Sequence, residues 1–413
     1  MKLLGITIKN YTSWKNLDLY FESFGPSLNI FIGMNNSGKS NLFRALILFV
    51  EVLQSCRDSP RSGTALNKSL WYCEDTSSPI EITCKFSIKH EKEKKLIDCK
   101  GDEVLVTARL QNEKYENMTR TMEIVNQDID INKDKLIDLI KEKIIFIPAD
   151  RGIAEVEKFN PRKVSAFNGR EIKNFLLKTK NNKNSSIFEN IQWDVRRILH
   201  NNPEVNCILE SDNVDLIVKD EIYTASINNC GSGLIDALII VTNIRYHPSC
   251  ILLIEEPEIH LHPEGQRKLL DFIWLYAREQ ALITTHSPLF VDYEKSRVHL
   301  VKKDKESKLL NIKREHLQLI KEELHILPTD ALLSSNLILL VEGPSDKIFL
   351  EGIMQNSKIY LLDKGLTIYP LNGKSEIRRL ARFIKETLGI PFFVMADSDF
   401  LNKAQELITE NKL

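Results

Sequence analysis

The sequence lacks three features that would each have pointed to a class of protein: an excess of basic charge, a long apolar run and closely spaced cysteines. Its 56 Lys and Arg residues are balanced by 57 Asp and Glu residues, which leaves a formal net charge of −1 at pH 7. Nucleic-acid binding therefore has to rely on a local basic patch. No apolar run reaches the roughly 18 residues that a membrane-spanning helix requires, so we expect no membrane partner. The seven cysteines form no C-x-x-C pair, which fits a reduced, cytoplasmic protein.

The order of apolar patterns predicts an α/β protein. At 413 residues the chain should hold two or three domains. Residues 1–32 alternate in the β manner, a helix is expected at 41–53, and the strands that follow are expected to be antiparallel because no crossover helix fits between them. Residues 155–205 break this pattern with two expected helices around a polar loop. A β/α pattern returns from residue 213, and a last β/α unit begins near residue 336.

The segment Gly33–Ser40 matches G-x-x-x-x-G-K-[ST] between an apolar strand and a helix, which is the context that this phosphate-binding motif requires. Its glycines let backbone N–H groups surround phosphate oxygens at a helix N-terminus. Lys39 would reach the β- and γ-phosphates, and Ser40 would ligate Mg²⁺. The alternative is a glycine-rich turn that carries an exposed lysine. The residues expected to bind ATP are Gly33, Asn35, Asn36, Ser37, Gly38, Lys39, Ser40 and Asn41.

A second segment delivers two acids, Glu255 and Glu256, at the end of the apolar run C-I-L-L-I. Glu255 would hold Mg²⁺ through water, and Glu256 would orient or deprotonate the attacking water. The alternative is a charged strand end that begins a helix. His260 and His262 lie two residues apart, but no cysteine or third histidine has ligand spacing, so we do not expect zinc.

Two smaller segments are compatible with the same nucleotide site. Ser232 and Gly233 precede an apolar helix and would offer a helix N-terminus to phosphate, although such a segment is usually only a turn. His286 follows the apolar run A-L-I-T-T, where it would sense the γ-phosphate. A lone histidine is more often structural, so this role depends on the neighbouring motifs.

Three carboxylates near the C-terminus also follow apolar runs. Glu342 follows L-I-L-L-V, and Asp397 and Asp399 follow F-F-V-M-A. Ligands gather at the carboxyl ends of strands in parallel sheets, and carboxylate oxygens are the ligands that Mg²⁺ prefers. Asp128 and Asp130 have the same D-x-D spacing without a buried strand before them, so we interpret that pair as a solvated turn.

A basic stripe lies between these carboxylates in the sequence. Its members share one face of an expected helix and are Lys374, Arg378, Arg382 and Lys385. The stripe would track DNA phosphates, which the balanced overall charge makes necessary. An ordinary solvated helix face explains the same spacing equally well.

Taken in order, four segments resemble the ABC-type ATPase head of SMC and RecF-like proteins: G-M-N-N-S-G-K-S-N, G-S-G-L, I-E-E-P-E-I-H-L-H-P and T-T-H-S-P. With E-G-x-x-D and D-x-D near the C-terminus, the chain resembles the OLD (overcoming lysogenization defect) family, which joins such a head to a TOPRIM domain. The resemblance implies an ABC-type P-loop ATPase with an antiparallel β subdomain and a helical insertion, followed by a TOPRIM α/β domain that lacks its C-terminal end. The implied boundaries are 1–154 and 206–330 for the ATPase, 155–205 for the insertion, a candidate dimerisation element, and 331–413 for the TOPRIM domain.

The resemblance implies further roles for the nucleotide-site residues. In ABC-type heads the signature loop of one protomer closes over the nucleotide of the other, so Ser232 and Gly233 would touch ATP in trans and the protein would be a homodimer. His286 would be the switch histidine, and the segment 260–263 would be the D-loop region. The sequence has no L-S-G-G-Q signature and no identifiable Q-loop glutamine. Arg151, in I-P-A-D-R-G, is expected near the nucleotide.

The TOPRIM resemblance implies a metal site for Mg²⁺ or Mn²⁺. Glu342, Asp397 and Asp399 would hold the metal with support from Asp346, and Glu342 would also act as a general acid or base in phosphodiester hydrolysis.

The first hypothesis is therefore an ATP-binding and ATP-hydrolysing, Mg²⁺-dependent DNA endonuclease of OLD type from a bacterium, for which the family suggests a role in defence against phage. The alternative is a nucleotide-gated DNA-binding or scaffold protein whose TOPRIM unit is inactive and which acts with a partner protein. A RecF-like repair ATPase is a third option, against which Glu342, Asp397 and Asp399 argue.

Overall fold

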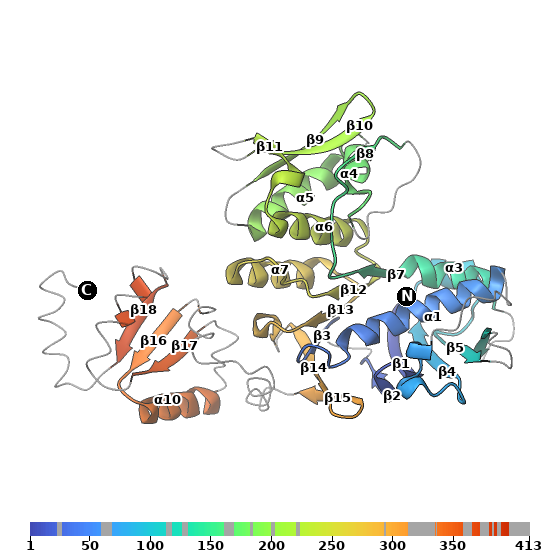
Figure 1. Ribbon diagram of the computed structural model, residues 1–413, viewed down its shortest axis with the longest axis horizontal. Coiled ribbons are helices and arrows are strands. Elements are labelled where there is room, and N and C mark those ends of the chain that lie inside the picture. The colour runs from blue at the N-terminus through green and yellow to red at the C-terminus, as the bar shows by residue number, and fades with distance from the viewer. Residues whose placement is uncertain are drawn as a thin grey trace, which may run out of the picture. The chain divides into compact units, whose positions relative to one another are not determined.

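The computed structural model divides the chain into two compact units, each with its own hydrophobic core (Figure 1). The first unit comprises Met1–Phe290 and Glu294–Leu317, and the second comprises Val291–Tyr293 and Gln318–Leu413. The structure describes residues 1–22, 27–58, 68–112, 118–125, 131–160, 169–181, 185–199, 203–219, 224–292, 295–312, 335, 337–357, 366–371, 380–381, 384–385 and 390–395.

A six-stranded sheet forms the centre of the first unit, in the order β15-β14-β3-β13-β12-β7. All neighbours are parallel except β15, which runs antiparallel to β14. Every residue of β3, β12 and β13 is buried, as expected for apolar strands in a parallel sheet. Their carboxyl ends therefore meet at one edge. The strands are β3 (Leu28–Ile32), β7 (Ile144–Ile147), β12 (Ile251–Glu255), β13 (Gln280–Thr285), β14 (Ser296–Lys303) and β15 (Ser307–Ile312).

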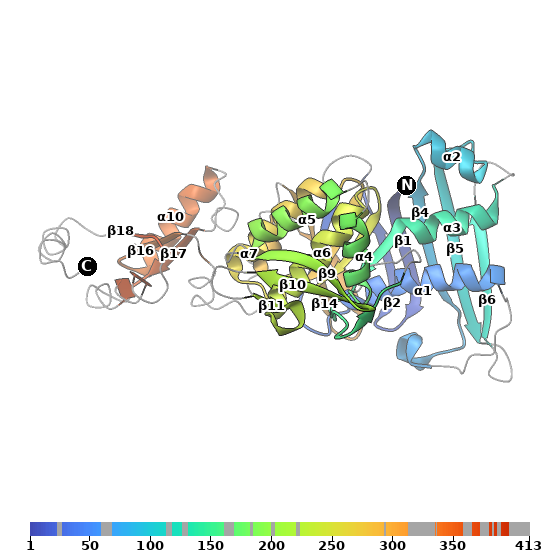
Figure 2. The same cartoon turned by 90° about the horizontal axis from the view of Figure 1, so that it is seen from above.

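The expected antiparallel β part is a five-stranded sheet in the order β2-β1-β4-β5-β6. Helices α1 and α3 run side by side across it (Figure 2), and Phe49 of α1 contacts Phe86 of β4 with ring centroids 6.2 Å apart. Helix α1 thus begins at the central sheet and packs on the antiparallel one, which joins the two sheets through one core. The elements are β1 (Lys2–Tyr11), β2 (Trp14–Tyr20), α1 (Lys39–Asp58), β4 (Ile80–Ser87), α2 (Glu91–Ile97), β5 (Glu103–Asn112), β6 (Met118–Val125) and α3 (Lys133–Lys143).

The two helices expected within residues 155–205 are present as α4 and α5, but they belong to a mixed α/β element. A small antiparallel sheet packs against α4, and its strands β9, β10 and β11 lie largely or wholly beyond residue 205. Alternate residues of β9 and β10 are buried, so this sheet covers the helices on one side. The elements are β8 (Glu157–Lys158), α4 (Ile172–Asn181), α5 (Ser185–Ile198), β9 (Glu204–Glu210), β10 (Asn213–Lys219) and β11 (Thr224–Ser226).

Two further helices connect this element to the central sheet. Helix α6 (Ser232–Tyr246) precedes β12, and α7 (Pro263–Tyr276) lies between β12 and β13. Helix α5 packs against both of them. None of the helices within the described ranges is long and apolar enough to cross a membrane.

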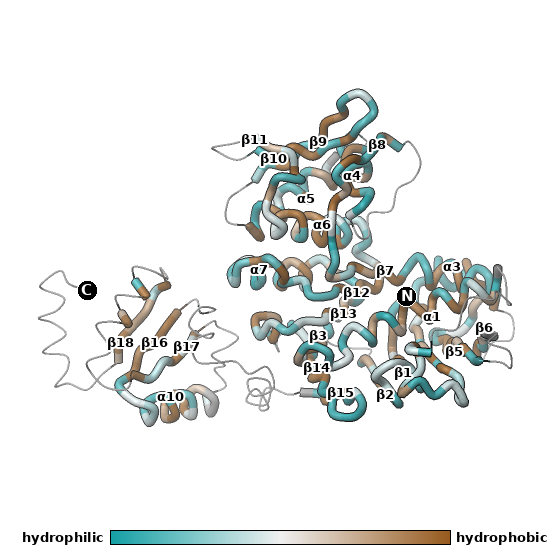
Figure 3. The backbone as a smooth tube through the Cα atoms, in the orientation of Figure 1, coloured by the Kyte–Doolittle hydropathy of each residue, from teal (hydrophilic) through white to brown (hydrophobic). Residues whose placement is uncertain are grey.

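The second unit contains a parallel sheet in the order β17-β16-β18. The central strand β16 is largely hydrophobic along its length (Figure 3), and Ile338 and Leu340 bury their side chains in the core of this unit. Helix α10 follows β16 directly. The elements are β16 (Leu337–Val341), α10 (Pro344–Asn356), β17 (Leu366–Pro370) and β18 (Phe392–Met395).

Candidate nucleotide and metal sites

The phosphate loop follows β3, and the first residue of α1 is Lys39. Gly38 has a φ of +107°, a conformation that glycine adopts without strain. A Cβ atom on Gly33 would lie 2.2 Å from the carbonyl oxygen of Val301. The Ser307 hydroxyl donates to the carbonyl of Ser37 at 2.6 Å and so holds the loop from the β15 side. The motif glycines are thus required both by backbone conformation and by close packing.

The Lys39 ammonium lies inside this loop. It donates to the carbonyl oxygens of Gly33 at 2.7 Å and Met34 at 3.0 Å, and it lies 3.9 Å from Oε1 of Glu256. Burial lowers the pKa of Lys39, and the negative charge of Glu256 opposes this. The loop therefore presents a cation at the point where a phosphate chain would meet the end of β12.

Glu255 is the last residue of β12 and is 7% exposed. Its Oε2 accepts the Ala149 amide at 3.4 Å, while Oε1 is buried and accepts no hydrogen bond within the described residues. Burial raises the pKa of Glu255, and the neighbouring Ser40 hydroxyl acts in the opposite direction. A buried carboxylate oxygen beside a hydroxyl is a donor set that a hard divalent cation prefers. Ser40 and Glu255 therefore fit a metal at the phosphate loop.

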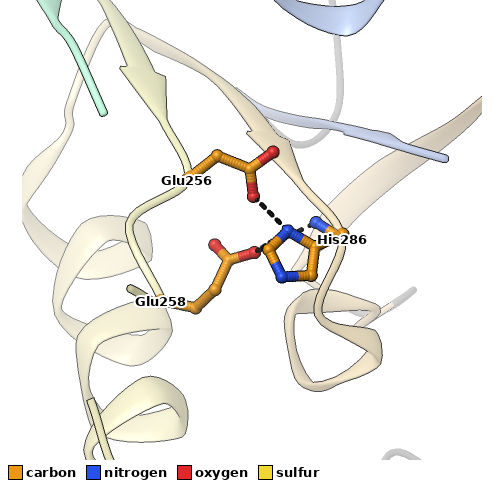
Figure 4. A group of neighbouring side chains, drawn as sticks. All are labelled: Glu256, Glu258 and His286. Carbon is orange, nitrogen blue, oxygen red and sulfur yellow. Dashed lines mark hydrogen bonds and ion pairs between the residues drawn. The ribbon is translucent and has the colours of Figure 1, made fainter. Parts of the chain in front are cut away.

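Glu256 lies just past the strand with a φ of +41°, which is a strained conformation for a non-glycine residue. Its Oε2 accepts a hydrogen bond from Nδ1 of His286 at 2.6 Å (Figure 4). Burial alone would raise the pKa of Glu256, but the His286 hydrogen bond and the Lys39 charge outweigh it, so the pKa lies below its usual value. The side chain is thus an ionised carboxylate facing the phosphate loop, as a general base must be.

Glu258 completes this cluster, and no role was predicted for it. Its side chain is buried, and Oε1 accepts hydrogen bonds from the Thr285 hydroxyl and from the amides of His286, at 3.0 Å, and Ser287, at 3.2 Å. Burial and the charge of Glu256 raise the pKa of Glu258 to about 7. Glu258 is visible in the sequence as the third acid of E-E-P-E. Only the fold shows that it anchors the loop after β13.

The three side chains of this cluster also meet the distance requirement for a shared cation. One ligand atom from each of Glu256, Glu258 and His286 lies within 4.8 Å of the others. The His286–Glu256 hydrogen bond and the nearby Lys39 ammonium explain why these side chains lie together without a bound cation.

Arg151 lies beneath the acids and not in the phosphate loop. It follows β7, is buried, and donates to the carbonyl oxygens of Pro148, Glu255 and Glu256. The sequence placed it near the nucleotide. Within the described residues its contacts are with the backbone that carries the two glutamates and with Asp236 of α6.

Ser232 and Gly233 form the first turn of α6. A Cβ atom on Gly233 would lie 2.6 Å from the carbonyl oxygen of His260, so the glycine lets the expected signature and D-loop segments pack together. Ser232 is exposed. His260 bonds Asp236 through Nδ1 at 2.9 Å, and His262 occupies the position before α7 without a side-chain hydrogen bond that caps the helix. The two histidines are therefore engaged in different parts of the fold.

Glu342 of the second unit directly follows β16. Asp346 lies in the first turn of α10, and its Oδ2 accepts the Gly343 amide at 2.9 Å, which stabilises the strand-to-helix turn. Strands β16 and β18 pair in parallel register, with Val341 opposite Met395. The remaining predicted residues of this unit lie outside the described residues, apart from Lys385, which is exposed; they are Lys374, Arg378, Arg382, Asp397 and Asp399.

Comparison with solved structures places the fold in a known class. A crystal structure of an SMC head bound to the C-terminal winged-helix domain of ScpA is 16% identical, covers 77% of this chain and 100% of that chain, and has a TM-score of 0.52. An SMC head with an extended coiled coil, bound to the C-terminal domain of ScpA from Pyrococcus furiosus, is 14% identical, covers 78% of this chain and 99% of that chain, and has a TM-score of 0.51. About three quarters of this chain thus has the fold of an SMC head.

Family models match both units. An AAA ATPase domain matches residues 1–192, an AAA domain described as a putative AbiEii toxin of a type IV toxin–antitoxin system matches 120–292, and the TOPRIM domain of overcoming lysogenization defect-like proteins matches 333–399. Such ATPase and TOPRIM domains use a nucleotide and a divalent metal. The TOPRIM match favours the predicted order of domains over a RecF-like ATPase alone.

Two curated proteins are similar to this chain. Endonuclease GajA of Bacillus cereus is 24% identical over 98% of this chain and 76% of its own length. The OLD nuclease of Thermus scotoductus is 26% identical over 36% of this chain and 30% of its own length. The chain therefore combines matches to ATPase domains with a match to an OLD-like TOPRIM domain, and both of these similar proteins are nucleases.

Proposed function

We propose that this protein is an ATP-hydrolysing, metal-dependent DNA endonuclease of OLD type that works as a homodimer in bacterial defence against phage. The observation that carries the nuclease part is the parallel register of β16 and β18. Because Val341 lies opposite Met395, the carboxyl ends of both strands lie at one sheet edge, where Glu342 begins the next segment and Asp397 follows two residues after β18. Nuclease relatives support the same function.

In this proposal Glu342, Asp397 and Asp399 would hold Mg²⁺ or Mn²⁺, and the metal would supply charge stabilisation at the phosphate and an activated water. Asp346 keeps the turn after Glu342 in place through its hydrogen bond to the Gly343 amide. The basic stripe at 374–385 supplies the local positive charge that the neutral chain otherwise lacks.

At the ATPase site Ser40 and Glu255 would hold Mg²⁺, which would supply positive charge to the phosphate oxygens. Lys39 would leave its loop carbonyls to pair with the phosphates, because a phosphate is a negatively charged acceptor whereas the two carbonyl oxygens are neutral acceptors. Glu256 accepts the proton of the attacking water, for which its lowered pKa and its hydrogen bond to His286 prepare it.

Ser232 supports the homodimer. It is exposed at the start of α6, and Gly233 beside it packs on the D-loop residue His260 and not on the phosphate loop. The Leu234 amide already donates to the Gly231 carbonyl, so the amides of Ser232 and Gly233 are the ones proposed to meet the nucleotide of a second copy. A protein that stays monomeric at micromolar concentration with and without ATP would contradict this assembly.

The nuclease proposal is tested by nicking of supercoiled plasmid with Mg²⁺ or Mn²⁺, with and without ATP. Wild-type protein should nick in a metal-dependent way, and Asp397→Asn should lose nicking while it keeps ATP hydrolysis. The chain offers a matched control in Asp130→Asn, since Asp128 and Asp130 repeat the D-x-D spacing but follow β6, an antiparallel strand, and themselves lie outside the described residues. Equal loss in both variants, or no nicking by the wild type, would favour the scaffold alternative with an inactive TOPRIM unit.

A further inference from the structure

Arg151 and Asp236 form a buried ion pair beneath the ATPase site. The Arg151 side chain is fully buried and that of Asp236 nearly so, with Nε and Oδ1 3.1 Å apart. Burying two charges is costly unless their remaining hydrogen-bonding groups are satisfied. Arg151 meets this condition by donating to three backbone carbonyls at 2.7 to 3.0 Å. The pair is therefore fixed in one geometry.

Two of these carbonyls belong to Glu255, the predicted metal ligand, and Glu256, the predicted catalytic acid. Nη1 donates to the carbonyl of Glu255 at 2.7 Å and Nη2 to that of Glu256 at 3.0 Å. Glu256 has a φ of +41°, and a strained turn of this kind persists only when its surroundings hold it. The planar guanidinium spans two successive carbonyls, which a lysine ammonium cannot do with the same geometry.

The other end of the pair connects to the expected signature and D-loop segments. Asp236 lies in α6, four residues after Ser232, and its Oδ2 bonds Nδ1 of His260 at 2.9 Å. His260 has a φ of +62°, and its carbonyl contacts Gly233. A continuous chain of contacts thus runs from the exposed first turn of α6 to the backbone of Glu256.

We propose that Arg151 and Asp236 are positioning residues for ATP hydrolysis, which set the Glu255–Glu256 turn according to the position of the first turn of α6. The proposal rests on the proposed ATPase function. Arg151 touches neither the predicted phosphate loop nor its lysine among the described contacts, so it acts on turnover through the glutamates and not on nucleotide affinity. Binding of a second copy to the first turn of α6 would move α6. Asp236 and Arg151 would transmit that movement to the Glu255–Glu256 turn.

The test compares Arg151→Lys and Asp236→Asn with a matched pair of variants, Arg245→Lys and Asp194→Asn. Arg245 and Asp194 form another ion pair with a buried carboxylate, which ties the same helix α6 to α5 away from the acids. For each purified full-length variant, ATP turnover, the dissociation constant of a fluorescent ATP analogue and the melting temperature are measured. The first pair should lower kcat by about 10- to 100-fold with affinity within about threefold, as losses of supporting partners do. The second pair should leave kcat within about twofold.

His260 supplies a rescue experiment. His260→Ala removes the bond to Asp236 and should lower kcat, while His260→Asn keeps a donor near Nδ1 and tolerates the left-handed conformation, so it should recover turnover. If Arg151→Lys keeps kcat, or loses kcat and affinity together with the same drop in melting temperature as Arg245→Lys, the positioning role is wrong. If Lys39→Ala hydrolyses ATP as well as the wild type does, the proposed ATPase site itself is wrong.

Discussion

Replacing Glu258 with glutamine should make the ATPase unit more stable above neutral pH. The Glu258 carboxyl is 4% exposed and its pKa is raised from 4.5 to about 7 by burial and by the charge of Glu256. Because this pKa is higher in the folded than in the unfolded protein, its contribution to stability is fully present below pH 4.5 and is lost as the pH rises through 7. A pKa shift of this size changes the free energy of unfolding by about 3 kcal/mol between low pH, where Glu258 is protonated, and high pH, where it is ionised.

Glutamine copies the protonated form of Glu258. Its Oε1 can accept the same hydrogen bonds from Thr285, His286 and Ser287, and its Nε2 replaces Oε2, which has no partner within the described residues. Glu258→Gln should therefore match the wild type at pH 5 within about 1 kcal/mol and exceed it by up to about 3 kcal/mol at pH 8.

Urea unfolding followed by tryptophan fluorescence between pH 5 and pH 8 measures this difference. All four tryptophans lie within Met1–Phe290, so the signal reports the larger unit alone. Glu189→Gln, an exposed change on α5, is the control and should shift the free energy of unfolding by less than about 0.5 kcal/mol. Parallel pH profiles of the wild type and Glu258→Gln, or a variant less stable at pH 8, would refute the protonation of Glu258.

Three further outcomes follow from the same site. Lys39→Ala should abolish nucleotide binding, measured by titration with a fluorescent ATP analogue, because Lys39 is the only basic residue of the segment Gly33–Ser40. Glu256→Gln should lower ATP turnover by about 10²- to 10⁴-fold in a phosphate-release assay while it keeps nucleotide affinity, since only the proton acceptor is lost. Gly33→Ala should lower the free energy of unfolding by about 1–3 kcal/mol in urea titrations, because its Cβ would lie 2.2 Å from the Val301 carbonyl; an alanine variant of wild-type stability would show that the close approach does not exist.

Much of the ATPase site could be predicted because each of its motifs directly follows a buried strand. The apolar runs before Gly33, Glu255 and His286 have a length typical of parallel strands, and parallel strands bring their carboxyl ends to one edge. The apolar run F-F-V-M-A likewise distinguished Asp397 from Asp130 in the sequence, although the strand that it forms, β18, is largely exposed.

The roles of Arg151 and Glu258 could not be predicted from sequence. Each depends on partners more than 25 residues away: Arg151 on the carbonyls after β12, and Glu258 on the loop after β13. A buried charge has no recognisable local pattern, because its pKa and its hydrogen bonds come from whatever the fold packs around it.

The helical element at 155–205 is another case in which contacts distant in sequence could not be predicted. Its two amphipathic helices were visible as periodic apolar residues, whereas the sheet that covers them comes mostly from strands beyond residue 205. The sequence by itself determined the domain order, the phosphate loop and the strand ends that carry the acids, since these depend on local spacing. Only the tertiary structure decided that β3, β13 and β12 are neighbours, that Glu258 anchors the His286 loop, and that Arg151 holds the Glu256 turn, because long-range pairing and burial determine those contacts.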